Sequence, residues 1–203
     1  MMRIAAVALA TSLSAVMAKA QDQTLLSGNA TYGGFGGPVV KLARIAGRDA
    51  VMVGGRGGLI VNGTFIIGGG GTGWRTESIR GSDGAAYQLD VGYGGVDLEY
   101  IHRTHQLVHF AVQLSLGGGR ATQGPAGGGP SRHVSFLIAE PGLHLELNVT
   151  KGFRVGAGVS YRFVSGLELP AFSNADLRGA AATLTFKLGK FSESARTTPT
   201  EPQ

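Results

Sequence analysis

Apolar residues recur at every second position in several stretches after residue 30. In "FRVGAGVSYRF", residues 153–163, they occupy the odd-numbered positions, whereas the even-numbered positions hold arginine, serine or glycine. The same alternation occurs in residues 110–116, 143–149 and 182–188. Because successive side chains of a β-strand point to opposite faces, this period predicts strands with one apolar and one polar face. The apolar set of the first stretch is Phe153, Val155, Ala157, Val159, Tyr161 and Phe163.

One stretch changes its phase. In residues 85–101 the apolar positions are first 87, 89, 91 and 93 and then 96, 98 and 100. The change falls at Gly94 and Gly95, and an extra residue in a strand reverses the face of everything that follows it. We therefore predict a β-bulge at these two glycines.

The alternating stretches and their separators predict eight strands. They lie at about residues 32–45, 49–61, 64–74, 85–101, 106–119, 132–147, 152–165 and 177–190. From the second connection onward, short turns (62–63, 102–105, 148–151) alternate with long loops (75–84, 120–131, 166–176). The Asn62-Gly63 pair favours a type I′ turn, in which both residues have positive φ. Pro38 has no N–H to donate, so we expect the first strand to join the wall only at Val39.

Short turns at one rim and long loops at the other are typical of a transmembrane β-barrel. We therefore predict an all-β fold, an eight-stranded antiparallel up-and-down transmembrane β-barrel with a polar lumen filled by side chains. The domain organisation follows from the rest of the chain. Residues 1–20 have the layout of a cleaved signal peptide, 21–31 form a short lead, 32–191 the barrel, and the polar residues 192–203 a disordered tail.

Composition supports export and gives no indication of nucleic acid binding. Removing Arg3 and Lys19 with the signal peptide leaves 18 − 2 = 16 basic side chains against 13 acidic ones, with no block of like charge. The chain has no cysteine, so packing or a closed hydrogen-bond network must hold it together. The 35 glycines are dispersed among apolar residues, unlike those of a linker. We expect the glycine pairs of residues 53–74 to leave room in the lumen for larger side chains and to permit the sharp coiling of the wall, so that Gly55→Leu or Gly69→Leu would impair assembly.

Three short motifs could form a functional site, but each also has a structural explanation. Residues 68–73 match the dinucleotide fingerprint Gly-x-Gly-x-x-Gly, but no amphipathic helix follows them. His102, His105 and His109 would converge on a metal only if they lay on a helix. Ser135 and His133, with Glu140 or Glu146 as the orienting acid, form the minimum of an acyl hydrolase, yet the apolar Val134, Phe136 and Ile138 place that pair on the face away from lipid. We expect no catalytic residues, no cofactor and no metal.

The polar faces of the predicted strands carry charges into the lumen. An eight-stranded barrel is only wide enough for side chains to fill it, so opposite charges must pair there. A narrow pore along these charges is the alternative. Large aromatic residues fall near the predicted strand ends, as headgroup-level rings do: Tyr32, Phe35, Trp74, Tyr87, Tyr100, Phe153, Tyr161 and Phe163. The predicted lumen network consists of Asp97, Glu99, Glu146, Arg154, Arg162 and Lys187.

Residues 32–74, from "YGGFGGPVVKLARIAG" to "FIIGGGGTGW", and residues 140–166, "EPGLHLELNVTKGFRVGAGVSYRFVSG", resemble small outer-membrane β-barrel proteins of diderm bacteria, of the OmpA/OmpX-like class. The resemblance extends from Tyr32 to Phe191. It implies a monomer in the cell outer membrane, in contact with outer-membrane lipid and with the outer-membrane assembly machinery. Phe191 is the aromatic residue nearest the end of the barrel, where such proteins often carry an assembly signal.

The function predicted from these features is structural or surface-interactive, carried by loops 75–84, 120–131 and 166–176. The alternative is a soluble periplasmic or secreted lipocalin-like barrel that binds a small apolar ligand with its apolar face turned inward. A narrow pore or a lipid-modifying barrel enzyme is the third reading. The direction in which Phe153, Val159 and Phe163 point separates the first two readings.

Overall fold

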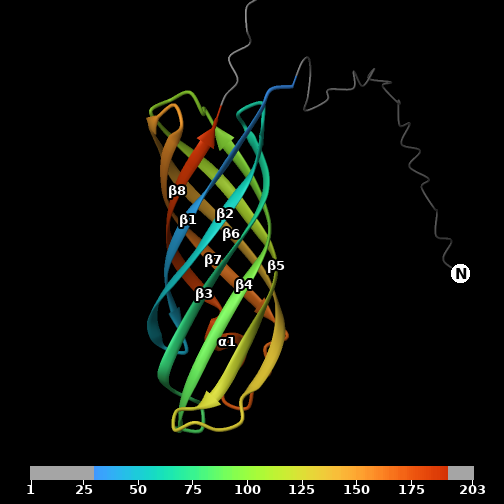
Figure 1. Ribbon diagram of the computed structural model, residues 1–203, viewed down its shortest axis with the longest axis vertical. Coiled ribbons are helices and arrows are strands. Elements are labelled where there is room, and N and C mark those ends of the chain that lie inside the picture. The colour runs from blue at the N-terminus through green and yellow to red at the C-terminus, as the bar shows by residue number, and fades with distance from the viewer. Residues whose placement is uncertain (1–29, 192–203) are drawn as a thin grey trace, which may run out of the picture.

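The computed structural model describes residues 30–191. The predicted signal peptide, most of the predicted lead and the predicted C-terminal tail lie outside the described residues. Within them the chain forms one closed barrel in which each strand pairs antiparallel with the next and β8 pairs with β1 (Figure 1). The predicted fold class is confirmed. The elements are β1 (Tyr32–Ile45), β2 (Arg48–Val61), β3 (Phe65–Arg80), β4 (Ala86–His102), β5 (Val108–Pro125), β6 (Arg132–Thr150), β7 (Phe153–Ser165), α1 (Asn174–Leu177) and β8 (Gly179–Lys190).

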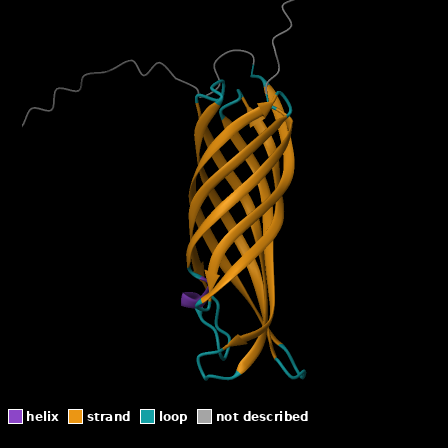
Figure 2. Cartoon of the chain, turned by 90° about the vertical axis from the view of Figure 1, so that its left-hand side faces the viewer, coloured by secondary structure: helices purple, strands orange, loops and turns teal. Residues whose placement is uncertain are grey.

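The two ends of the barrel differ. The first and last described residues and three short turns lie at one end, here called the terminal end, at the top of Figure 1. The Asn62-Gly63 turn is there, and both residues have the predicted positive φ, 52° and 66°, within a three-residue connection, 62–64. The opposite end, here called the loop end, carries α1, the two-residue turn Ala46-Gly47 and the connections 81–85, 126–131 and 166–178. Strands and loops continue beyond the level of α1 (Figure 2). Among residues 30–191 no helix has the length and hydropathy of a membrane-spanning helix.

Three strand boundaries differ from the prediction. β3 continues to Arg80 instead of ending near residue 74, β5 continues to Pro125 instead of 119, and β6 continues to Thr150. The predicted loops 75–84 and 120–131 therefore shrink to residues 81–85 and 126–131. Residues 75–80 and 120–125 lack a regular apolar alternation because a register shift between Thr76 and Ile79 interrupts β3, and because the inward residues of β5 here are Ala121 and Gln123. The sequence period therefore fades while the backbone pairing continues.

The predicted bulge at Gly94 and Gly95 is wrong. These residues pair without a break with Gly71 and Gly70 of β3, and the irregularity in this pair of strands lies between Thr76 and Ile79. Leu89 and Val91 are buried in the lumen, whereas Val96, Leu98 and Tyr100 are exposed on the outside. The apolar side chains thus change from the inner face to the outer face of a regular strand.

The apolar side chains of β6 also change from the inner to the outer face, a change that we call the polarity inversion. Phe136 and Ile138 are buried inside the barrel, whereas Leu143 and Leu145 are 57% and 61% exposed on the outside. Near the loop end the barrel has an apolar inside and a polar outside, as a water-soluble domain has. Along the rest of its length the barrel has a polar inside and an apolar outside. We call the part near the loop end, residues 74–92, 119–138 and 166–178, the head.

Pro38 does not keep β1 out of the wall, contrary to the prediction. β1 pairs with β2 along its whole length, including Pro38 with Gly55. The missing N–H is accommodated on the other side, where the pairing with β8 passes from Gly36 directly to Val39. The defect is therefore confined to one side of one strand.

Position 54 must be glycine because the backbone of a neighbouring strand lies too close to leave space for a Cβ atom. A Cβ atom at Gly54 would overlap the carbonyl oxygen of Gly71 on β3, and one at Gly68 would overlap that of Gly57 on β2. A Cβ at Gly55, by contrast, would meet nothing nearer than 3.5 Å. The predicted link between these glycines and the sharp coiling of the wall therefore fits Gly54 and Gly68, where neighbouring backbone atoms leave no space for a Cβ atom. The sharply coiled wall itself excludes the side chain at these positions.

We predict that Gly54→Ala destabilises the barrel by about 1–3 kcal/mol, the usual cost of forcing an extra carbon into a packed site. The folded fraction, read as heat-modifiable mobility in cold electrophoresis, should fall. Gly55→Ala is the matched control and should fold as the native chain does. Equal behaviour of the two variants would contradict the backbone-contact explanation.

Candidate functional site

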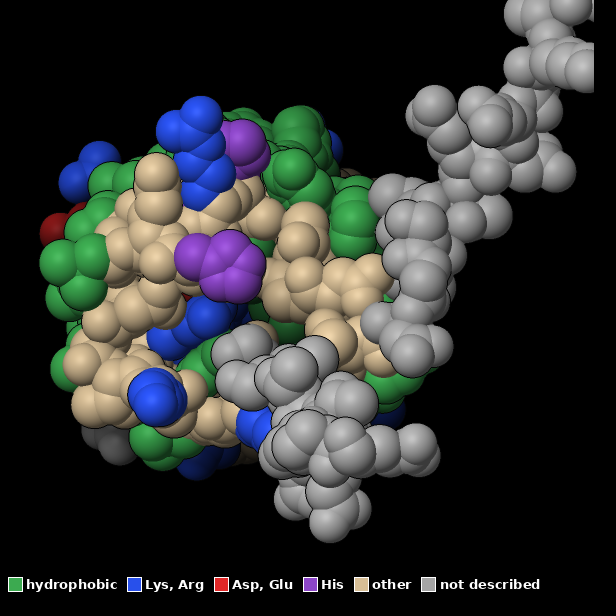
Figure 3. Space-filling model, turned by 90° about the horizontal axis from the view of Figure 1, so that it is seen from above, with side chains coloured by type: hydrophobic (Ala, Val, Ile, Leu, Met, Phe, Trp, Pro, Cys, Tyr) green, Lys and Arg blue, Asp and Glu red, His purple; other side chains and the backbone are tan. Residues whose placement is uncertain are grey.

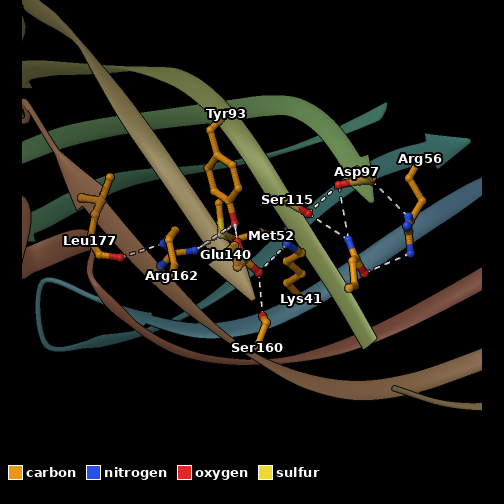
Figure 4. Close-up of polar contacts among 11 residues, drawn as sticks. Lys41, Met52, Arg56, Tyr93, Asp97, Ser115, Glu140, Ser160, Arg162 and Leu177 are labelled. Atoms are coloured by element: carbon orange, nitrogen blue, oxygen red, sulfur yellow. Dashed lines mark hydrogen bonds and ion pairs between the residues drawn. The ribbon is translucent and has the colours of Figure 1, made fainter. Parts of the chain in front are cut away.

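A polar network around Glu140 crosses the lumen (Figure 4). The Lys41 ammonium donates to Glu140 Oε1 at 2.7 Å, and the Ser160 hydroxyl donates to the same oxygen at 2.6 Å. The Tyr93 hydroxyl donates to Glu140 Oε2 at 2.9 Å and accepts from Arg162 Nη1 at 3.0 Å. Strands β1, β4, β6 and β7 are thereby tied together through one carboxylate that is 2% exposed.

Arg162 links this network to the head. Its Nε donates to the carbonyl oxygen of Leu177 at 2.7 Å, and its guanidinium lies 5.4 Å from the centre of the Tyr93 ring. Arg162 is 1% exposed. Its Nη1 donates to the Tyr93 hydroxyl, which in turn donates to Glu140, and the bond to Leu177 fixes the segment that carries α1.

A second network lies on the terminal-end side. Arg56 binds Asp97 (Nε to Oδ2, 3.2 Å) and Glu99 (Nη1 to Oε2, 2.8 Å). Lys187 bridges Glu99, at 2.5 Å, and Glu146. Asp97 also accepts from Ser115 and Gln113, and His109 Nε2 lies 3.4 Å from Glu146 Oε2. Every ion of this network is at most 8% exposed, so each charge depends on its partners for the solvation that water would give.

The structure places all six residues of the predicted lumen network inside the barrel. It brings Asp97, Glu99, Glu146 and Lys187 into one network and places Arg162 in the other. Arg154 joins neither, because its guanidinium lies over the ring of Phe191, 4.1 Å from the centroid.

Sequence reasoning missed the partners that complete the networks. Lys41 and Arg56 share the inward phase of Val39 and Met52, a signal that glycines on either side obscure. From the sequence alone, Glu140 has a role only as the orienting acid of a hydrolase. The missed members are Lys41, Arg56, Tyr93, His109, Gln113, Ser115, Glu140 and Ser160.

Apolar layers close the lumen above and below the networks. At the terminal end, Phe35, Ile60, Ile66, Ile101, Ala111 and Phe191 form a buried cluster. Phe191 stacks on Phe35, so this aromatic residue faces inward. Seen from this end, Figure 3 shows hydrophobic side chains around the circumference and histidine and basic side chains near the rim. At the loop end a larger apolar cluster, which includes Met52, Leu89 and Phe136, fills the barrel.

Residues 166–178, which contain the predicted outer loop 166–176, pack into the loop end of the barrel. Leu167, Phe172 and Leu177 are at most 3% exposed within the loop-end cluster. The Ala171 N–H donates to Gln123 Oε1 at 3.3 Å, and the Ala171 carbonyl accepts from the Ser82 N–H at 3.2 Å. This segment is a lid over the inner face of the head.

The water-facing side of the head carries polar grooves. One, of about 430 Å³, lies over β3, β4 and β5 and is lined by Arg75, Gln88, Asp90, Thr122 and Ser131 among others. Its Arg75–Asp90 ion pair is 3.1 Å long and largely exposed. A second, of about 390 Å³, separates residues 131–134 from the lid residues 168–170.

Loop 81–85 of the head is held by Asp83. The Tyr87 hydroxyl donates to Asp83 Oδ2 at 2.6 Å, and the Ala85 N–H donates to Oδ1 at 3.0 Å. These bonds, the Tyr87 bond first, hold the pKa of the Asp83 carboxyl below its usual range because they favour the ionised form.

The orientation predicted for the hydrolase pair is wrong. His133 and Ser135 are exposed on the outer face, because Val134, Phe136 and Ile138 turn into the apolar interior of the head. Glu140 and Glu146 are buried inside, on the opposite side of the wall. Neither carboxylate can therefore orient His133.

The other two candidate sites also lie in the barrel wall. Residues 68–73 belong to β3 and run on as strand, with no helix after them. The three histidines do not converge: His102 stacks on Phe110, His105 is exposed in a turn, and His109 points into the lumen. Within residues 30–191 no group of three possible ligands is placed to hold a metal.

Only some of the aromatic residues predicted for the belt lie on the outer face of the barrel. Tyr32, Tyr100, Tyr161 and Phe163 are between 41% and 56% exposed on the outer face. Phe35 is buried in the lumen, and Trp74 and Tyr87 pack against the loop-end cluster. Aromatic residues near the strand ends therefore point outward in some cases and belong to the two apolar clusters inside the barrel in others.

No protein-family model matches the chain, and a search of curated proteins gives no match. Solved structures do match. Neisserial surface protein A superposes with a TM-score of 0.54 at 13% identity, over 80% of this chain and 97% of that one. The N-terminal β-barrel domain of OprF from Pseudomonas aeruginosa gives 0.49 at 16% identity, over 79% and 97%, and the attachment invasion locus protein Ail of Yersinia pestis gives 0.39 at 17%, over 81% and 98%. The superposition on Neisserial surface protein A shows that the two proteins share the fold of an eight-stranded antiparallel barrel.

We predict that Lys187→Met destabilises the barrel by roughly 3–5 kcal/mol, because it leaves Glu99 and Glu146 buried without their cation. The measurement is the urea unfolding midpoint in lipid vesicles. Lys151→Met, in an exposed turn, is the control and should leave the midpoint within experimental error. A Lys187→Met midpoint equal to that of the control would show that the network does not hold the barrel together.

Proposed function

We propose that the protein is an integral, non-conducting outer-membrane barrel whose head is a recognition surface at the cell exterior. The observation that carries this proposal is the polarity inversion along β4 and β6. A wall with apolar side chains outside and charged side chains inside suits lipid. A wall with the opposite order suits water, and the chain contains both in one continuous barrel.

The exposed apolar side chains support the membrane part of the proposal. Leu59, Ile67 and Val159 are 63%, 59% and 62% exposed, on three different strands. A contiguous apolar surface of this kind is costly in water. The soluble lipocalin-like alternative requires Phe153, Val159 and Phe163 to line the lumen, but they face outward, and the lumen beside them holds Arg154 and Arg162 instead.

The orientation follows from the connections. Barrels of this class have short turns on the periplasmic side and longer connections outside. We therefore propose that the terminal end faces the periplasm and the head projects from the cell. Outer-membrane lipid and the assembly machinery are the partners that this arrangement requires.

The recognition role belongs to a smaller surface than the three predicted loops. The lid 166–178 is held in the loop end, so its main role is structural. Loops 81–85 and 126–131 and the polar groove lined by Arg75, Gln88 and Asp90 remain exposed. Paired charges and amides in a water-facing groove favour a hydrophilic ligand that offers both donors and acceptors.

We predict that a cysteine at Gly127 is labelled by a membrane-impermeant maleimide on intact cells. The chain has no native cysteine, and a Cβ at Gly127 meets nothing within 4 Å. Lys151→Cys, in a turn at the terminal end, should be labelled only after the outer membrane is permeabilised. The reverse labelling pattern would place the head in the periplasm, and recovery of the protein in a detergent-free soluble fraction would overturn the membrane assignment.

We also predict that the purified barrel produces no stepwise conductance in planar bilayers. Apolar clusters close both ends of the lumen, and ion pairs fill its middle. Single-channel recording over a range of voltages is the measurement. Reproducible unitary steps from the native chain would favour the narrow-pore reading instead.

A further inference from the structure

A polar cluster lies on the outer face of β5 and β6, where the apolar outer wall ends. Arg120 and Thr122 point outward, because Ala121 between them is buried in the loop-end cluster. In the pairing of β5 with β6, Ser135 lies opposite Arg120, and His133 lies opposite the next outward residue. Directly opposite residues of an antiparallel pair have Cβ atoms about 4.5–5.5 Å apart on one face. A guanidinium, two hydroxyls and an imidazole therefore share one patch, which we call the boundary cluster.

The apolar wall borders the boundary cluster on the side of the terminal end. The next outward residues there are Gly118 on β5 and Leu137 on β6, and Leu137 is 69% exposed. On β4, Gly92 lies opposite Arg120. A Cβ atom at Gly92 would meet nothing within 4 Å, so the coiling of the wall does not demand glycine at this position. Because these glycines carry no side chain, a hydrocarbon chain can lie close to the wall beside Arg120.

The Arg120 guanidinium differs from other outward arginines of the loop end in its partners. Arg44, the first outward polar residue of β1, pairs with Asp49 at 3.3 Å. Arg75 pairs with Asp90 at 3.1 Å. Arg120 forms no ion pair or side-chain hydrogen bond with any residue that the structure describes. Arginine is well suited to phosphate, since its planar fork offers two parallel N–H donors. A phosphate group at the edge of the apolar wall would supply the missing partner.

The two polar grooves of the head meet beside the boundary cluster. The groove of about 430 Å³ includes Thr122, the groove of about 390 Å³ includes His133, and both include Ser131. Pockets that bind small molecules have volumes of about 300–1,000 Å³. The described charges within the two grooves sum to zero, so Arg120 beside them adds an uncompensated positive charge. The residues that carry those charges are Arg75, Asp90, Arg132 and Glu168.

We propose that the boundary cluster and its two grooves bind a phosphorylated glycolipid of the surrounding leaflet. The phosphate pairs with Arg120, the sugars enter the grooves, and an acyl chain lies along the wall at Gly92 and Gly118. A phospholipid would offer the phosphate and the chain but no sugar for the grooves. This inference rests on the proposed function in one respect, because a glycolipid of the outer leaflet meets the site only if the head faces the cell exterior.

Lipid A, a phosphorylated glucosamine disaccharide that carries acyl chains, is the probe for this site. The purified barrel in detergent micelles is titrated with lipid A, and the bound lipid is counted by native mass spectrometry. We expect one lipid A for each folded chain at saturation. Lipid A without its phosphates, and phosphatidylglycerol, should each bind about tenfold more weakly or worse, because the first lacks the charge-assisted bonds to Arg120 and the second lacks the sugars.

Arg120→Gln should weaken the binding of lipid A by about tenfold or more, since it removes the cation that pairs with the phosphate. Arg44→Gln is the matched control. Arg44 is also an exposed arginine just beyond the apolar wall, but it pairs with Asp49 and lines neither groove. This control should bind lipid A as the native chain does.

Gly92→Leu tests the path of the acyl chain, because the new side chain would occupy the wall beside Arg120. It should also weaken the binding of lipid A. Gly36→Leu, on the outer face of β1, is its control and should leave the affinity unchanged. A Cβ atom at either position meets nothing within 4 Å, so both variants should fold, as heat-modifiable mobility will show.

Equal affinity of Arg120→Gln and the native chain for lipid A would overturn the site. Equal affinity of the native chain for phosphatidylglycerol would overturn the choice of a glycolipid. Binding in micelles does not depend on the orientation of the barrel in the cell. Absence of lipid A binding would therefore overturn this inference alone, whereas labelling of Gly127→Cys only after permeabilisation would overturn the proposed function.

Discussion

Closure of eight strands into one wall leaves a lumen so narrow that each inward polar group must be satisfied by another inward group. Lys187 forms ion pairs with both Glu99 and Glu146, because these buried carboxylates are shielded from the water that would otherwise solvate them. Glu140 accepts three donors from three strands for the same reason. The tight coiling that closes the wall also brings neighbouring backbones so close that a side chain cannot fit at Gly54 or Gly68. Ion networks, glycines and the apolar layers at both ends are consequences of one geometric restriction.

The polarity inversion adds a second level of organisation. In the part of the barrel that we propose to span the membrane, the outer side chains are apolar, as lipid favours, and the lumen holds the polar ones. In the head, water selects polar outer side chains and the interior becomes an apolar core, covered by the lid 166–178. Arg162 joins the two parts, because its guanidinium binds Tyr93 of the polar network and the Leu177 carbonyl of the lid. The head is therefore anchored to the barrel by a buried charge and by apolar packing together.

The sequence period predicts the number, order and direction of the strands because alternation survives wherever one face of the wall is apolar. The period does not predict which face of a strand is apolar where the strand passes from the membrane-facing part into the head. The phase shift at Gly94 indicated a bulge because a single apolar face was assumed, and the same assumption put Val134 and Phe136 on the lipid side. Pairing partners such as Arg56 with Asp97 depend on the stagger between strands, which no pattern within one strand encodes. The lumen location of Arg154 and Lys187 could be read from parity, whereas their partners could not.

Site-directed spin labelling along β4 tests the central claim most directly, since the native chain has no cysteine. Nitroxides at 96 and 98 should be relaxed mainly by oxygen, which concentrates in lipid, and those at 88 and 90 mainly by a water-soluble nickel complex. Labels at 89, 91 and 97 should be poorly accessible to both reagents. An uninterrupted period of two across Gly94 and Gly95 is the predicted result. Lipid accessibility at 89 and 91, with the phase reversing at the two glycines, would contradict the polarity inversion and restore the bulge.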